Sequence, residues 1–563
     1  MDSSTEQPPG LNTDRSLNAK MIWFSRPLFS WRYGPLALLA LLGISLAISS
    51  CSKQPVDLRT ALPSDSLIYL ETSDLARTIR AITSNPRFLQ LGGKAPNLSM
   101  LEGVRVSVAV TGFQSSEEAA AMEGAVLNFR PLFVAVIDTR AWDFQALSFT
   151  ENRIGEFVNE MYGGEVELVA AEKQSGRSFT WSARDGRKAF AFVREGLIFF
   201  GNDETAIDRS LALLNGGGEN ITANAKVNSL PVDALASGYV STEGVGQLAN
   251  IIGVSLAIGA GDDGDVRSFI SRVVPEITRN SVTEVTWTAR SLDDGKIADL
   301  YTVHLEAETA RVLAETITPS IAGDSELSRF VPLEIASTTR YNLSDPHIAW
   351  RAVLMTARTK TDTVTGSLLT AFSSILFSPY GIDDEEVFLK AAASELQTVR
   401  FDEDGDEVAV IARPRDLEAL KRAIAREIPM SQAPERFENA EIWRSADNDL
   451  AAARYENIVV IGEARSVERC IAARNSGINS SALLKGSGLF NPSSAIFSYN
   501  ADPDDAAGIV STISGRTASN TPSMTRFYTV ESRFNEKGLE RRTVSDFGLV
   551  GTLIIRLGAE RRE

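Results

Sequence analysis

The stretch Arg194–Gly217, "REGLIFFGNDETAIDRSLALLNGG", decides how this chain is organised. Its apolar run Leu197–Phe200 predicts a buried strand, Gly201 predicts a corner, and the polar residues that follow predict the start of a helix. A strand, a glycine and a helix also begin many phosphate-binding loops. The stretch therefore has two interpretations, a nucleotide site or a joint of the fold.

The residues after Gly201 argue against a nucleotide. A phosphate loop needs several glycines whose N–H groups converge on the anion, commonly together with a lysine. Here a single glycine is followed by Asn202, Asp203 and Glu204. Carboxylates cap a helix N-terminus and complement its dipole, but they repel phosphate. We therefore predict a structural corner whose acidic residues cap the helix.

A second copy of this stretch predicts an internal duplication. The segment Tyr455–Gly477, "YENIVVIGEARSVERCIAARNSG", repeats the strand, the glycine (Gly462) and the helix. Flanking segments match in the same order, at offsets of roughly 260–275 residues. The matched flanks are the segments near Leu62 and Val331, Phe133–Leu147 and Val408–Leu420, those near Asp233 and Ser493, and Thr283–Glu308 and Phe527–Phe547.

The fold class follows from composition and from the order of elements. The chain has 563 residues, of which 44% are hydrophobic and 23% charged, which is typical of globular protein and too long for one core. Hairpins with interspersed amphipathic helices predict an α+β fold. We expect two tandem repeats, residues 61–320 and 322–558, each a mainly antiparallel sheet with helices packed on one face. The two modules are expected to pack face to face.

The N-terminal segment has the order of a secretory signal. Arg26 and Arg32 precede an apolar run, residues 36–48, and two small residues then lead to Cys51. The last four residues resemble a bacterial lipobox, in which the cysteine is lipidated. We therefore predict an N-terminal extension and lipoprotein signal peptide over residues 1–50. A lipidated Cys51 and a polar tether would follow over residues 51–60.

The predicted anchor has one alternative, a transmembrane helix. The uncharged run over residues 34–50 falls short of the ~20 residues that span a bilayer, so we favour lipid on Cys51. Either Met1 or Met21 is the true start. Ser52, rather than aspartate, follows the cysteine; by resemblance to enteric lipoproteins this favours an outer membrane, facing the periplasm, if the cell has one.

Charge and residue counts exclude several classes of function. The formal net charge of −17 argues against nucleic acid and against a polybasic contact with anionic lipid. The chain has two cysteines, Cys51 and Cys470, and two histidines, His304 and His347. They are too few and too scattered for a zinc site or a disulfide framework, so we predict no metal and no cofactor.

Acidic clusters raise the question of calcium. The segment Phe401–Val410 places three aspartates at alternating positions, but the glycine and the final glutamate of an EF-hand loop are missing. We favour a hairpin turn at Asp404-Gly405. The three aspartates are Asp402, Asp404 and Asp406. Weak calcium binding remains the alternative at this segment and at the acidic clusters of residues 261–265 and 383–386.

No catalytic constellation is evident. His304 lies in a predicted strand and His347 near a predicted helix start, and no GxSxG elbow accompanies either histidine. Cys470 corresponds to Ser210 in the first copy, which favours a packing position over a redox thiol. Gly244–Gly261 is the most apolar segment after the leader. It predicts a buried helix, with part of a cleft or a partner surface as the alternative.

The chain resembles a family of exported bacterial proteins known only as a domain of unknown function. The resemblance lies in the opening strand at Leu62–Glu71, in the strand–glycine–helix middle, and in an aromatic-containing strand that leads into a helix. It covers most of the mature chain through diffuse motifs. It implies the fold and export, and no catalytic residues.

These observations predict a membrane-anchored extracytoplasmic lipoprotein. We expect no enzymatic activity and a binding or envelope-interaction role, with an envelope protein or an apolar ligand as the partner. One alternative is a carrier that holds an apolar ligand in a cleft between the modules. A carboxylate-based hydrolase is the less favoured alternative, because it would need converging polar groups in a pocket.

Overall fold

The computed structural model describes residues 56–559, and Asp57–Glu563 forms one compact unit. The leader and Cys51 lie outside the described residues, as do Asp404 and residues 260–263 of two acidic clusters. The internal segments that are not described are 121–123, 174, 260–263, 321–325, 363–364, 367–368, 370–372, 374, 403–404, 425, 488–493, 502–505 and 515–525. Side chains are also not described over residues 116–128, 256–270 and 556–559.

The strands divide evenly between the two halves of the chain. The first half contributes β1 (Ile68–Thr72), β2 (Arg105–Ala120), β3 (Gly124–Asp138), β4 (Glu167–Lys173), β5 (Gly176–Ser182), β6 (Lys188–Arg194), β7 (Leu197–Gly201), β8 (Ala236–Val240), β9 (Val282–Ser291) and β10 (Ile297–Leu305). The second half contributes β11 (Ser337–Asn342), β12 (Ala392–Arg400), β13 (Val408–Pro414), β14 (Glu435–Phe437), β15 (Ala440–Arg444), β16 (Leu450–Tyr455), β17 (Ile458–Glu463), β18 (Ile496–Ala501), β19 (Phe527–Asn535) and β20 (Gly538–Ser545).

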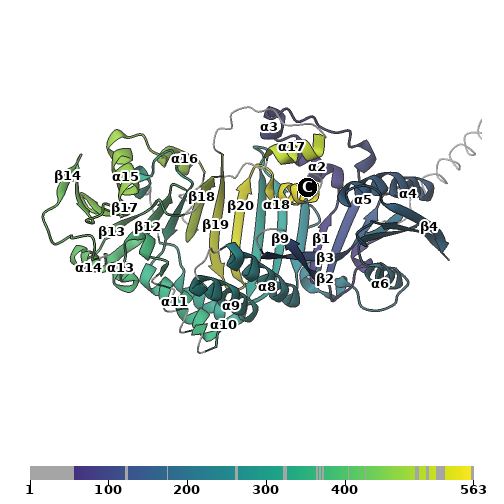
Figure 1. Ribbon diagram of the computed structural model, residues 1–563, viewed down its shortest axis with the longest axis horizontal. Coiled ribbons are helices and arrows are strands. Elements are labelled where there is room, and N and C mark those ends of the chain that lie inside the picture. Colours follow the sequence, from purple (N-terminus) through teal and green to yellow (C-terminus); the bar gives the residue numbers. More distant parts are fainter. Residues whose placement is uncertain are drawn as a thin grey trace, which may run out of the picture. The chain divides into compact units, whose positions relative to one another are not determined.

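Helices lie between the strands in both halves (Figure 1). Those of the first half are η1 (Leu58–Ala61), α2 (Leu75–Thr83), α3 (Pro86–Gln90), η2 (Ser99–Leu101), α4 (Asp143–Phe149), η3 (Thr150–Ile154), α5 (Gly155–Met161), α6 (Glu204–Leu214), η4 (Ile221–Ala223), α7 (Ala225–Asn228), α8 (Thr242–Gly259), α9 (Gly264–Ser281) and α10 (Ala307–Thr316). Those of the second are η5 (Leu327–Phe330), α11 (Pro346–Thr359), η6 (Ser378–Tyr380), α13 (Glu385–Ala391), α14 (Leu417–Ala423), α15 (Ala464–Ser476), α16 (Ser481–Gly486), α17 (Ala506–Ser514) and α18 (Gly548–Ala559).

The twenty strands of the described residues belong to one sheet whose paired strands are antiparallel, and the protein is an α+β fold. In the first half the order is β4-β5-β6-β7-β3-β2-β1-β8-β9-β10. In the second half it is β14-β15-β16-β17-β13-β12-β11-β18-β19-β20. The two orders correspond strand for strand.

The halves join edge to edge, through the pairing of β10 with β20 around Leu300 and Arg542. Our expectation that the modules pack face to face is therefore wrong. The physical reason is the free edge that each half would otherwise have, since an unpaired strand leaves a row of N–H and C=O groups without partners. Pairing the last strand of each half covers one edge of each, and β4 and β14 remain the outer strands.

Helices cover both faces of the sheet, so our prediction of helices on one face is also wrong. On β13, Ala409 and Ile411 belong to a core that includes α15, while Val410 and Ala412 belong to another that includes α13 and α14. Successive side chains of a strand point to opposite faces. The continuous apolar run of β13 is therefore buried on both sides, which needs a helical layer on each.

Two helices cross the join between the halves. After β10, α10 packs on β19 and β20 of the second half; after β20, α18 packs on β9 and β10 of the first half. Trp287 and Ile297 of the first half share a core with Phe547 and Val550 of the second. Each half therefore contributes a helix to the core of the other half. In Figure 1, α17 and α18 lie at one end of the central strands and α8 to α11 at the other.

The two glycines of the repeated stretch occupy the same place in the sheet. Gly201 ends β7 opposite Val134, and Gly462 lies near the end of β17 opposite Ala409. Asp203 caps α6, and Glu463 caps α15 by accepting two backbone N–H groups. The predicted structural corner is therefore confirmed, with carboxylates at the position where a phosphate would have to bind.

A glycine is needed at each corner because the neighbouring strand comes too close for a side chain. A Cβ atom on Gly201 would lie 2.1 Å from the Phe133 carbonyl oxygen, and one on Gly462 would lie 2.1 Å from that of Val408. Both contacts are to backbone, which a rotamer change cannot relieve. The glycines are thus explained by strand packing alone.

We expect Gly201→Ala to lower the free energy of unfolding by about 1–3 kcal/mol, the usual cost of overpacking. Urea unfolding followed by circular dichroism measures this. Gly486→Ala is the matched control, because nothing lies within 4 Å of a Cβ at that position. Equal unfolding midpoints for the two variants would contradict the close-approach explanation.

Candidate functional site

The two histidines lie on different elements of the fold. His304 is on β10 and is 8% exposed, with its Nδ1 atom 3.3 Å from the Lys226 ammonium, which also pairs with Glu284 at 3.2 Å. Burial and the Lys226 charge lower the pKa of His304. A neutral, buried imidazole beside a lysine is a sheet-face residue, as one of our two interpretations predicted. His347 lies in the first turn of α11.

Cys470 and Ser210 are both fully buried, on α15 and α6 respectively. Burial raises the pKa of the Cys470 thiol to about 12, so the thiolate that redox or nucleophilic chemistry needs is not formed near neutral pH. The packing interpretation of this position is confirmed.

The loop after β12 is a hairpin turn organised by Asp402. Its carboxylate accepts backbone N–H groups from Gly405 at 3.0 Å, Asp406 at 3.1 Å and Glu407 at 3.2 Å. Burial acts in the opposite direction, but these three donors hold the pKa of Asp402 below its ordinary value. Both oxygens of the Asp402 carboxylate are therefore engaged by the turn itself.

The acidic segment at residues 383–386 is likewise used by the fold. Asp384 caps α13 by accepting the Val387 N–H at 2.9 Å, and Glu385 accepts the Ser373 hydroxyl at 2.8 Å. Within the described parts of the chain, no group of three or more His, Cys, Asp and Glu side chains is placed to hold a metal ion.

Of the segment Gly244–Gly261, residues 244–259 form most of α8, which packs against α9. Val245 and Ala249 are buried, whereas Ile252 is half exposed. The prediction of a buried helix therefore holds for one side of its described part.

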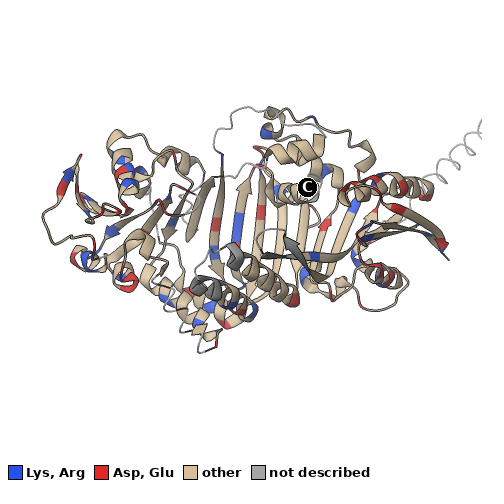
Figure 2. Ribbon diagram, viewed as in Figure 1, with Lys and Arg blue, Asp and Glu red and all other residues tan. Residues whose placement is uncertain are grey.

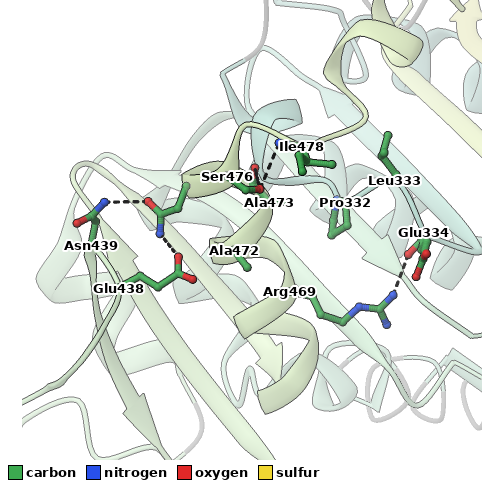
Figure 3. A pocket seen from close by; sticks show the side chains of 11 residues that line it. Pro332, Leu333, Glu334, Glu438, Asn439, Arg469, Ala472, Ala473, Ser476 and Ile478 are labelled. Atoms are coloured by element: carbon green, nitrogen blue, oxygen red, sulfur yellow. Dashed lines mark hydrogen bonds between the residues drawn. The ribbon is translucent and has the colours of Figure 1, made fainter.

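A broad cavity of about 690 Å³ lies beside α15, and we call it the α15 pocket (Figure 3). Arg469 donates to the Glu334 carbonyl oxygen at 3.0 Å and stacks over Phe401, and Asn475 donates to the Glu438 carboxylate. Its polar groups are thus engaged with one another. The lining residues are Pro332, Leu333, Glu334, Glu438, Asn439, Arg469, Ala472, Ala473, Asn475, Ser476 and Ile478.

A second cavity, of about 720 Å³, lies in the first half, and we call it the first-half groove. Its floor contains Val106 of β2 and Ile137 of β3, which are opposite each other in the sheet. Helices α2, α4, η2 and the turn η3 supply the walls. The remaining lining residues are Leu75, Met100, Leu101, Val104, Thr139, Ala141, Phe144, Gln145, Ala146, Ser148, Phe149, Asn152, Arg153 and Glu156.

The first-half groove is predominantly apolar and is open to solvent at its rim. Met100 is 80% exposed and Phe144 is 67% exposed, and Trp142, two residues before Phe144, is 74% exposed. Large exposed apolar side chains gathered at a cavity mark binding surfaces more often than scattered ones do. We did not predict this groove from the sequence. Trp142 and Phe144, exposed at the start of α4, are the local signal, because apolar residues at a helix start are ordinarily covered.

Charges of both signs are interspersed over the molecule (Figure 2). On the central strands, Arg542 lies 3.6 Å from Glu531, and Arg533 donates to Glu540. Neighbouring charges of opposite sign cancel much of each other's field, so these strands do not form a surface that attracts a polyanion.

Comparisons of the chain with models of protein families, with curated proteins and with solved structures give no match. In the described ranges no helix combines the length and the apolar character needed to cross a membrane.

Proposed function

We propose that the protein is a lipid-anchored, extracytoplasmic binding protein without enzymatic activity. The anchor is inferred from the leader, in which a basic segment, an apolar run and small residues lead directly to Cys51. Lipid on that cysteine would hold the folded body at a membrane, the outer membrane facing the periplasm if the cell has one.

The binding role is supported above all by the first-half groove. It has the volume of a ligand or peptide site, an apolar floor and exposed apolar side chains at its rim. A carrier of an apolar ligand is the second candidate, and the same groove favours it. We place that ligand in the groove rather than between the modules, because the halves join by strand pairing.

We further propose that the body consists of two copies of one module, residues 61–320 and 322–558. The shared strand order supports this, as does the equal register of Gly201 and Gly462. So does a backbone detail: Glu195 and Glu456, in the turns before β7 and β17, both have a φ of 54°. On the same sequence features we propose kinship with the exported bacterial family that the chain resembles.

We expect Cys51→Ser to abolish acylation and to move the protein from the membrane fraction to the soluble fraction. Mass spectrometry of the mature N-terminus and cell fractionation measure the two effects. Cys470→Ser is the matched control and should stay at the membrane, since serine already occupies the corresponding position, Ser210, in the first half. A processed chain with an unmodified Cys51, or an uncleaved leader, would overturn the lipoprotein proposal.

A further inference from the structure

We propose that the first-half groove is a docking site for a short amphipathic helix of a partner protein. The helix would carry adjacent aromatic and leucine side chains behind an acidic first turn. This inference rests on the proposed binding role and names its site and partner, but it does not depend on the lipid anchor. It follows from comparing the two halves position by position.

The floor of the groove has a counterpart in the second half. Gly201 pairs with Val134 of β3, and Gly462 pairs with Ala409 of β13. The residues three positions further along these two strands are Ile137 and Ala412. Ile137 is paired with Val106, and Ala412 is paired with Leu396. The two pairs therefore occupy the same place on the same face of their half-sheets.

In the second half this place is covered by a helix of the chain itself. Phe388 and Leu389 of α13 are 1% and 5% exposed, and they share a core with Leu396 and Ala412. Helix α13 packs against α11, α14 and β12. The second half thus shows which shape and chemistry such a floor accepts: a short helix that inserts an aromatic ring and a leucine.

In the first half the walls are present, but the three-residue turn η2 stands before β2 where the seven-residue helix α13 stands before β12. Helix α2 follows β1 as α11 follows β11, and α4 follows β3 as α14 follows β13. The short helix α3 does not take the place of α13, because its Phe88 packs in the core beneath α17 and α18. The described residues therefore leave about 720 Å³ open above Val106 and Ile137.

A basic residue of α2, the helix that supplies Leu75 to the groove, matches an acidic helix start. In the second half, Arg351 of α11 lies 3.9 Å from Glu386, in the first turn of α13. Asp74 caps α2, and Asp345 caps α11. Arg80 and Arg351 each lie six residues after the cap of their helix, so Arg80 corresponds to Arg351.

Arg80 is available for such a partner at little cost. It pairs with Glu102 at 3.2 Å, and both side chains are more than half exposed. Exposed pairs of this kind contribute little to stability, so an incoming carboxylate can replace Glu102.

The composition of the walls favours a helix over an acyl chain. One wall, from α4 to α5, carries Gln145, Ser148, Asn152, Arg153 and Glu156. A fatty acyl chain would leave these polar groups facing hydrocarbon. An amphipathic helix places its apolar stripe on the floor and its polar flank beside them, which is the common helix-in-groove mode of recognition.

The test uses the full-length chain and a helix-stapled, fluorescein-labelled peptide of residues 382–392, "IDDEEVFLKAA". Stapling is needed because so short a helix is marginal in water. Fluorescence polarisation should show saturable binding that weakens at least tenfold in Phe144→Asp, and at least tenfold when alanines replace Phe388 and Leu389 in the peptide. Leu333→Asp, in the α15 pocket, is the matched control and should bind as the wild type does.

A charge swap tests the orientation of the helix. Arg80→Glu should weaken binding about fivefold or more, and a peptide with Glu386→Lys should restore it. Absence of saturable binding to the wild type, or equal affinity for wild type and Phe144→Asp, would overturn the proposal. The proposal would also be overturned if the peptide did not bind and palmitate bound the wild type but not Phe144→Asp. None of these results alters the Cys51 fractionation test, so the two proposals fail independently.

Discussion

We expect Glu395→Ala to lower the free energy of unfolding by about 3 kcal/mol. Arg340 lies on β11 with 1% of its side chain exposed, and its Nε donates to the Glu395 carboxylate at 2.5 Å. Removing one member of a buried pair costs about 3–5 kcal/mol, because the other charge stays buried after its counter-charge is lost. Glu395 is 23% exposed, so solvent can reach the site and the lower end of that range applies.

Urea unfolding of the full chain measures this effect, and a double variant supplies the control. Arg340→Met with Glu395→Leu removes both charges while keeping the volume, and such replacements are often neutral or stabilising. The double variant should therefore recover most of the loss seen in Glu395→Ala. A loss below about 0.5 kcal/mol in the single variant would show that the pair contributes no more than an exposed one.

The first half places a largely buried residue of the opposite charge at the position of Arg340. By the register of the strands, Glu71 of β1 corresponds to Arg340 of β11. Glu71 accepts from Arg59, from the Tyr69 hydroxyl and from Ser237. The residue types are reversed, so sequence comparison of the halves does not detect the correspondence. It becomes visible only when strand register defines which residues are equivalent.

The sequence predicted local structure well because the signals there are local. A strand, a glycine with no room for a side chain and a carboxylate cap fix the corners at Gly201 and Gly462 wherever the rest of the chain goes. Cys470 could be placed in a core by the same reasoning, from its apolar neighbours.

Features that depend on distant segments could not be predicted in this way. The run Val408–Ala412 is apolar throughout, which fits a strand buried on both faces as well as a short buried helix segment. The edge strand of each half pairs with a strand more than 200 residues away in the chain, as Leu300 pairs with Arg542. Local sequence signals do not reveal such a pairing. The groove above Ile137 exists because one covering helix is not in place, and the residues that line it have ordinary apolar character.

The join between the halves carries the second large prediction, at Asp299 of β10. This carboxylate is 1% exposed and accepts the Trp287 indole N–H at 2.8 Å and the Leu549 backbone N–H at 2.9 Å. It thereby caps α18, which belongs to the other half of the chain. Burial raises the pKa of Asp299, and the two hydrogen bonds oppose that rise only in part.

We expect Asp299→Asn to lower the free energy of unfolding at neutral pH by about 1–3 kcal/mol. The amide turns its NH₂ group toward one of the two N–H donors, which leaves that buried donor unsatisfied. Hydrogen exchange at the backbone amides of α18 should accelerate with it. Asp416→Asn, at the exposed cap of α14, is the matched control, and we expect it to change the free energy by less than about 0.5 kcal/mol.

The pH dependence of stability distinguishes the effect of the Asp299 charge from the effect of its hydrogen bonds. Because the folded pKa is raised, the folded state binds a proton that the unfolded state releases. The contribution of Asp299 to wild-type stability therefore falls as pH rises from the ordinary carboxyl range through the folded pKa, and is constant above it. Asparagine does not titrate, so the wild type should gain stability relative to Asp299→Asn as pH is lowered from neutral. A difference that stays constant with pH would mean that Asp299 is not titrating at the join, and that its role there is hydrogen bonding alone.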